Sequence, residues 1–266
     1  MSGRRLALAA VVALAVGAGG PAQARRDRAL SGDALRAARL LGEAQVAAAR
    51  PVIAALVARA PDEPEVRWLT AELAMLDGDY PRAVASLVGV PDDAVDGEVG
   101  ATRALAQRSA ELTASFVRVP SPSGRFVVAH APGPDATIAA LAGEVLDAAA
   151  AAIGADLGYT PPGPIRVELL GSPADLARLS TLTEAEIETT GTIALSKYGK
   201  LMVVSPRATL VGYPWMDTLA HSTCTWWWRA RPRAGAGVAA GGARALRATA
   251  VARGALRRRR RVAHAG

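Results

Sequence analysis

The sequence predicts an α+β protein in which N-terminal α-helical hairpins come first and a small mixed sheet follows. Residues 31–114 are rich in Ala, Leu and Arg, and their apolar side chains recur at helical spacing. From residue 115 onward the apolar pattern alternates every second residue, which is typical of strands, and helical segments lie between these strands. A chain of 266 residues is long enough to give each part its own core.

The helical part has clear start and stop signals. Ser31 or Asp33 can cap the first helix, and Pro51, Pro61 and Pro81 are expected at the turns between later helices.

One segment of this part, residues 68–84, resembles a tetratricopeptide repeat unit. Its small residues Ala71, Ala74 and Ala83 would let two antiparallel helices approach closely, and Tyr80 would fill the groove between them. A short stack of such hairpins can serve as a spacer, or it can bind a peptide or protein partner. The residues leave both roles open.

The part from 115 to 221 is predicted to form the sheet. The Pro-Ser-Pro-Ser-Gly segment at 120–124 predicts a β-hairpin, and Thr183 with Glu186 predicts a capping box at the start of a helix. The expected elements are strands at 116–119 and 125–128, a helix at 136–153, a strand at 165–170, helices at 173–180 and 183–188, strands at 192–195 and 201–204, and a helix that begins at 216. The strands at 192–195 and 201–204 are expected to form a second hairpin around a tight turn at 198–200.

The N-terminus predicts a signal peptide over residues 1–24. Arg4 and Arg5 precede a short apolar run, and Ala22-Gln23-Ala24 matches a small-x-small cleavage site. Export to the periplasm or the extracellular space is therefore expected, with an uncleaved N-terminal membrane anchor as the alternative. The apolar run is too short for a comfortable span, so no stable membrane span is expected after cleavage.

The positive charge of the chain lies in its tail. Residues 222–266 contain eleven arginines and no acidic residue, so the formal charge of +7 leaves −4 for residues 1–221. An exported body with this charge is not expected to bind nucleic acid. A basic arm at 257–261 that binds nucleic acid or anionic lipid remains an alternative.

Three segments between 151 and 221 carry a second resemblance: GADLGYTPPGPIRVEL, STLTEAEIETTGTIALSKYGKLMVVSP and GYPWMDTLAH. They resemble the peptidase-MA-like, gluzincin-type zinc metallopeptidases that follow tetratricopeptide repeats in exported bacterial proteins. The resemblance implies a zinc helix with the motif H-E-x-x-H, whose histidines bind zinc and whose glutamate activates water. It also implies a third ligand from a W-L-x-E-G segment, and a strand that pairs with the peptide substrate. The substrate strand is expected at Leu201, Met202, Val203 and Val204.

His221 matches the first zinc ligand of that motif, and the residues after it depart from the motif. Ser222 replaces the glutamate and Thr225 replaces the second histidine. The chain as written is therefore predicted to bind no zinc and to be inactive. His130 is expected to be a surface or loop histidine rather than a ligand.

A reading-frame change would explain this departure. Tryptophan has the single codon TGG, so the segment 226–228 fixes its coding triplets. With ordinary codons for 221–228, restoring one G after the His221 codon gives H-E-Y-V-H-L-V-V. The segment 238–248 similarly gives W-L-Q-E-G-L-A-R-Y-E in another frame. The sequence thus predicts a frameshift after His221 and a disordered tail over 222–266. The alternative is a non-catalytic periplasmic scaffold that binds a partner through its repeats.

Overall fold

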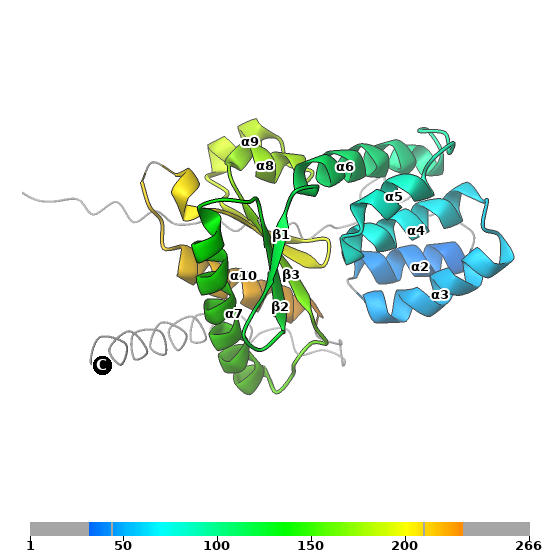
Figure 1. Ribbon diagram of the computed structural model, residues 1–266. Helices are drawn as coiled ribbons and strands as arrows, with labels where there is room; N and C mark the ends of the chain where they lie inside the picture. Colours follow the sequence, from blue (N-terminus) through cyan, green and yellow to red (C-terminus); the bar gives the residue numbers. More distant parts are fainter. Residues whose placement is uncertain (1–31, 44, 210, 231–266) are drawn as a thin grey trace, which may run out of the picture.

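The computed structural model describes residues 32–43, 45–209 and 211–230 (Figure 1). Within these ranges the chain forms helices first and then a five-stranded mixed sheet flanked by helices, so the predicted α+β class is confirmed. The predicted signal peptide at 1–24 and the tail from 231 to 266 lie outside the described residues.

The helical module, residues 32–113, packs its helices in neighbouring pairs. It consists of α2 (Gly32–Gly42), α3 (Val46–Arg59), α4 (Pro64–Asp77), α5 (Tyr80–Ser86), the 3₁₀ turn η1 (Val95–Gly97) and α6 (Glu98–Thr113). Ala71, Ala74 and Ala83 are buried where α4 meets α5, as predicted from their size. Pro51 is a correction, because it lies inside α3 and not at a turn. Pro51 is the sixth residue of α3, beyond the first turn, so the helix lacks the hydrogen bond that an amide at this position would donate to the carbonyl oxygen of Ala47.

The turn between α4 and α5 places Tyr80 at one end of the helical module. Gly78 ends α4 in the left-handed conformation with φ +69°, which a residue without Cβ adopts readily. The side chain of Asp79 then caps α5 by accepting a hydrogen bond from the amide of Arg82. Tyr80 is the first residue of α5, and its side chain reaches out of the helical module toward the sheet.

The sheet has the strand order β1-β2-β3-β5-β4. Its strands are β1 (Val117–Pro120), β2 (Phe126–His130), β3 (Ile165–Leu170), β4 (Ala194–Lys197) and β5 (Lys200–Val204). β1 with β2 and β4 with β5 form the two predicted antiparallel hairpins, whereas β2, β3 and β5 run parallel. The two edge strands therefore both belong to hairpins.

Helices cover both faces of the sheet (Figure 1). α7 (Asp135–Leu157) and α10 (Trp215–Ala230) pack on one face, and α8 (Pro173–Arg178) and α9 (Glu184–Thr190) pack on the other. A short 3₁₀ turn, η2 (Pro206–Ala208), follows β5. The predicted capping box of Thr183 and Glu186 is present at the start of α9.

α7 is the one helix in the described ranges that is long and apolar enough to cross a membrane by length and composition. It packs against β2 and α10, and its buried residues belong to the core of the sheet.

α10 continues past His221, which corrects the predicted tail. The helix runs through Ala230, so the prediction of disorder from residue 222 is wrong for 222–230. Ala220, Thr223, Cys224 and Trp227 are buried, and they recur at helical spacing along the side of α10 that packs on the sheet. This spacing lets α10 cover part of the apolar face of the sheet.

We expect Trp227→Ala to lower the free energy of unfolding by about 3–5 kcal/mol. The indole is fully buried and its Nε1 donates a hydrogen bond to the carbonyl oxygen of Tyr159 at 2.7 Å, so the change removes both packing and a polar contact. Urea denaturation followed by circular dichroism measures the loss. Trp226→Ala is the matched control with a smaller expected effect, because Trp226 is only partly buried. Equal effects of the two substitutions would contradict the docking of α10 beyond His221.

Candidate functional site

His221 lies in the second turn of α10 and is partly exposed. The position one turn later, which the family motif assigns to the second histidine, is held by Thr225. The hydroxyl of Thr225 donates to the backbone carbonyl of His221 at 3.2 Å. Ser222, at the position of the motif's glutamate, is buried. α10 therefore offers one imidazole where zinc peptidase chemistry needs two imidazoles and a carboxylate.

The donor set around α10 does not fit a catalytic metal. The described residues contain no cluster of three or more His, Cys, Asp or Glu side chains that could hold a metal ion. Cys224 lies on the same helix, but burial raises the pKa of its thiol, which disfavours the thiolate that binds metals. No zinc-dependent step can be assigned to these residues.

Leu201, Met202, Val203 and Val204 do not form an edge strand, which corrects the predicted position of the substrate strand. They lie in β5, which pairs with β3 on one side and with β4 on the other. All five residues of β5 are buried, and a continuous apolar run of this kind is typical of an interior strand. The edge strand beside the helix of His221 is β4, because α10 packs against both β4 and β5.

His130 is not a surface histidine, which corrects the prediction made for it. It ends β2 with only 2% of its side chain exposed, and its Nδ1 lies 2.7 Å from the carbonyl oxygen of Ala131. Its Nε2 is buried without a hydrogen-bond partner among the described residues.

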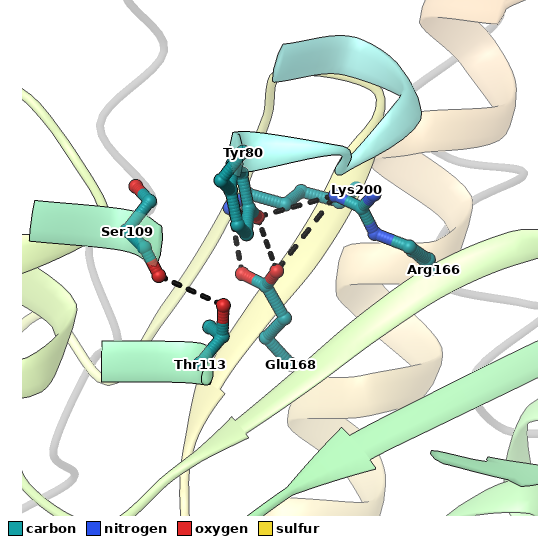
Figure 2. Close-up of polar contacts among 6 residues, drawn as sticks. All are labelled: Tyr80, Ser109, Thr113, Arg166, Glu168 and Lys200. Carbon is teal, nitrogen blue, oxygen red and sulfur yellow. Dashed lines mark hydrogen bonds and ion pairs between the residues drawn. The ribbon is translucent and has the colours of Figure 1, made fainter. Parts of the chain in front are cut away.

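The most densely connected polar site joins the helical module to the sheet (Figure 2). We call it the interface cluster: Tyr80, Arg166, Glu168 and Lys200. Arg166 and Glu168 are two residues apart on β3 and so share one face of the sheet, and Lys200 is the register partner of Arg166 on β5. Tyr80 approaches from α5, so the cluster unites residues from both parts of the chain.

Ion pairs and hydrogen bonds connect the four residues of the interface cluster. Lys200 Nζ lies 2.6 Å from Glu168 Oε2, while the Tyr80 hydroxyl donates to Glu168 Oε1 and accepts from Lys200 Nζ. Arg166 Nη2 also donates to the Tyr80 hydroxyl at 3.2 Å. In Figure 2 the Tyr80 ring lies above the Glu168 carboxyl group, with Lys200 and Arg166 beside it.

Gly78 lets Arg166 join the cluster. A Cβ atom at position 78 would lie 1.0 Å from Arg166 Nη1, so only glycine leaves room for the guanidinium beside the α4–α5 turn. The guanidinium carbon lies 5.4 Å from the centre of the Tyr80 ring, which is within cation–π range.

Burial determines the protonation of the cluster. The exposed fractions are 3% for Tyr80, 2% for Glu168 and 0% for Lys200. Burial, together with the charge of Glu168, raises the pKa of Tyr80 well above its ordinary value, so its hydroxyl remains a donor. Burial lowers the pKa of Lys200, and the carboxylate of Glu168 opposes this shift. Because no solvent reaches these groups, their arrangement suits a structural joint and not a reaction on a substrate.

A hollow of about 240 Å³ lies at the carboxyl ends of β2, β3 and β5. Its polar groups already pair with one another: Asp135 Oδ1 accepts from the Ser205 hydroxyl at 2.9 Å and lies 3.6 Å from Arg207 Nε. This pairing leaves little charge there to recognise a ligand.

Sequence analysis missed the interface cluster, although signals for it exist. Arg166 and Glu168 place two charges on one face of an otherwise apolar strand, and Lys200 begins an apolar run. Such charges are seldom buried unless they are paired, so they indicate a partner on another segment.

No protein-family model, no curated protein and no solved structure matches this chain. Its function is therefore inferred from its residues and their geometry.

We expect Lys200→Met to lower the free energy of unfolding by about 3–5 kcal/mol, because the buried Glu168 carboxyl group loses its ion-pair partner at 2.6 Å and keeps only the more distant Arg166 at 3.7 Å. Chemical denaturation measures the loss. Arg59→Met is the control: Arg59 pairs with Asp33 on the surface, with 63% and 56% of the two side chains exposed. Breaking an exposed pair of this kind costs about 1 kcal/mol or less. The double variant Glu168→Gln/Lys200→Met should lose less than the sum of its single changes, and strict additivity would contradict the coupling.

Proposed function

We propose that this chain is related to the exported, repeat-bearing zinc metallopeptidases and that, as written, it does not hydrolyse peptide bonds. The observation that carries the proposal is α10, which packs beside the edge strand β4 and holds His221 followed by Ser222 and Thr225. A metal helix next to an edge strand is the arrangement that the family resemblance implies. The residues on that helix are not the ones that the chemistry needs.

α10 lacks two groups that the chemistry needs, the second zinc ligand and the catalytic base. A catalytic zinc takes three protein ligands and keeps one position open for water, and a nearby carboxylate removes a proton from that water. His221 supplies one ligand, and Thr225 stands at the place of the second. The Ser222 hydroxyl cannot act as the base at neutral pH, because a neutral hydroxyl oxygen accepts a proton far too weakly and the hydroxyl does not ionise to an alkoxide.

The edge strand supports the same proposal. An extended peptide adds to a sheet through main-chain hydrogen bonds at an unpaired edge. β4 has β5 as its only neighbour in the sheet order, so its outer edge faces no other described strand. We assign to β4 the peptide-pairing role that the sequence places on 201–204.

A second candidate function is a non-catalytic periplasmic scaffold. The interface cluster favours it, because buried polar contacts fix the helical module on the sheet. A protein partner bound by the helical module would then be held at a fixed place relative to the sheet.

Sequencing the coding DNA across the His221 codon distinguishes the two candidates. A lost base at this codon supports a metallopeptidase ancestor interrupted by a frameshift. An unambiguous sequence with no lost base overturns the frameshift and leaves the scaffold.

We expect Thr225→His to bind Zn²⁺ about tenfold or more tightly than the unsubstituted chain, because histidines four residues apart on one helix can bind the same ion. Competition with a chromophoric zinc chelator measures the affinity. Thr225→Gln is the size-matched control without an imidazole, and Thr225→His/His221→Ala should lose the gain. Equal affinities for Thr225→His and Thr225→Gln would mean that positions 221 and 225 do not form a metal pair, and would remove the basis of the family proposal.

A further inference from the structure

The turn between β4 and β5 contains a strained tyrosine. Tyr198 and Gly199 both have left-handed backbone angles, φ +54° and +66°. Two-residue hairpin turns of this kind favour Asn or Gly at such positions. A side chain with a Cβ costs about 1 kcal/mol there. The tyrosine side chain therefore has a contact that offsets its backbone strain.

That contact is with the helical module. Tyr198 packs against the core of the helical module and against the core under α8 and α9. A Cβ on Gly199 would lie 3.5 Å from the side chain and the carbonyl oxygen of Leu76, near the end of α4. Figure 1 shows the turn, in yellow, pointing from the sheet toward the helical module.

The phenol lies among charged groups of α4 and α6. Burial raises the pKa of Tyr198 to about 12, and a hydrogen bond with Thr181 opposes the rise. The charges of Glu72, Glu98 and Arg108 have smaller effects on the same pKa. The ammonium of Lys197 lies 4.9 Å from the centre of the ring and donates to the Thr181 hydroxyl at 2.9 Å.

Both sides of the turn are thus attached. Lys197, at the end of β4, bonds to the segment before α9, and Lys200, at the start of β5, enters the interface cluster. Between them Tyr198 packs against the helical module, near charged residues of α4 and α6.

We propose that the β4–β5 turn is a ligand that the helical module holds in cis, and that a partner which takes the α4–α6 face releases Tyr198 and loosens the edge strand β4. The partner would present an aromatic residue beside a lysine, which is the chemistry of the turn itself. The release of β4 does not depend on the proposed peptidase ancestry, whereas its effect on a peptide paired with β4 rests on the peptide-pairing role proposed above.

The position of β4 explains why it responds. It has four residues and pairs with β5 alone, whereas β5 is also held by β3. Once the turn is released, β4 keeps its pairing with β5 and its contact with α10, but it loses its attachment to the helical module. Short edge strands with few contacts open at low free energy. By linkage, a peptide paired with β4 would weaken binding of a partner at the α4–α6 face by the same factor.

Hydrogen exchange of the full chain tests the coupling. In Tyr198→Ala we expect the amides of β4 to exchange about tenfold or more faster, with the amides of β2 and β3 unchanged. Tyr198→Phe keeps the ring and is the matched control, so its β4 should stay protected. Unchanged protection of β4 in Tyr198→Ala would overturn the proposal, and so would equal loss of protection across all strands.

A disulfide gives a second test that does not rely on loss of a side chain. The Cβ of Leu76 lies 4.0 Å from where a Cβ on Gly199 would be, a separation that suits a disulfide. In the Tyr198→Ala chain with Leu76→Cys, Gly199→Cys and Cys224→Ala, oxidation should restore β4 protection and reduction should remove it. Equal protection of β4 in the oxidised and reduced forms would refute the proposal that the turn attaches β4 to the helical module.

The synthetic peptide Ser-Lys-Tyr-Gly-Lys, with the sequence of 196–200, tests the partner chemistry. It should bind Tyr198→Ala saturably at millimolar concentration, as judged by chemical-shift changes in α4 and α6, and should not bind the unsubstituted chain. Failure to bind Tyr198→Ala would overturn the assignment of the turn as a ligand.

Discussion

The ion pair between Lys200 and Glu168 lies where the helical module meets the sheet, and the arrangement of both parts depends on it. Moving charges from water into a protein interior costs several kcal/mol for each ion, so they persist only where partners replace the lost water. Glu168 finds these partners in Lys200 and in the Tyr80 hydroxyl. Tyr80 belongs to the helical module, so the cluster is complete only when the two parts are docked. A separate sheet would expose two cations and one anion on one face, and the docked helices cover them.

The turn that delivers Tyr80 also explains why the two parts meet at this point. Gly78, Asp79 and Tyr80 close the α4–α5 hairpin, and in a helical repeat this turn needs only to reverse the chain. Here the same three residues form one side of the interface: Gly78 makes room for the Arg166 guanidinium, and Tyr80 bonds to Glu168. The turn that closes the α4–α5 hairpin thus also forms part of the contact with the sheet. The closeness of Gly78 to Arg166 makes the fit specific, because any side chain at position 78 would displace the guanidinium.

Local patterns in the sequence predict much of the fold and little of the site. Both β-hairpins, the capping box at Thr183 and the close approach of α4 and α5 follow from neighbouring residues and are confirmed. Strand order does not follow from them, because alternation tells which residues share a face and not which strands are neighbours. For this reason the sequence wrongly predicts residues 201–204 at the edge of the sheet. The interface cluster joins Tyr80 to Glu168 across 88 residues, a separation that no local pattern spans. Past His221 the unusual composition hid the helical spacing that ends in the buried Trp227.

One side of α10 packs on the sheet, and another side carries the positions that the zinc motif uses. Leu219, Ala220, Thr223 and Trp227 pack on the sheet, whereas the positions that the zinc motif uses are 221, 222 and 225. Changes at 221 and 225 therefore leave the packing side of the helix in place beneath β4. The other support of β4 is the turn that follows it. In this turn Tyr198 packs on the helical module, and Lys197 donates a hydrogen bond to Thr181. An edge strand held at both places keeps its shape whether or not a metal helix is complete. The peptide-pairing role proposed for β4 and the attachment proposed for the β4–β5 turn therefore do not require a complete metal site on α10.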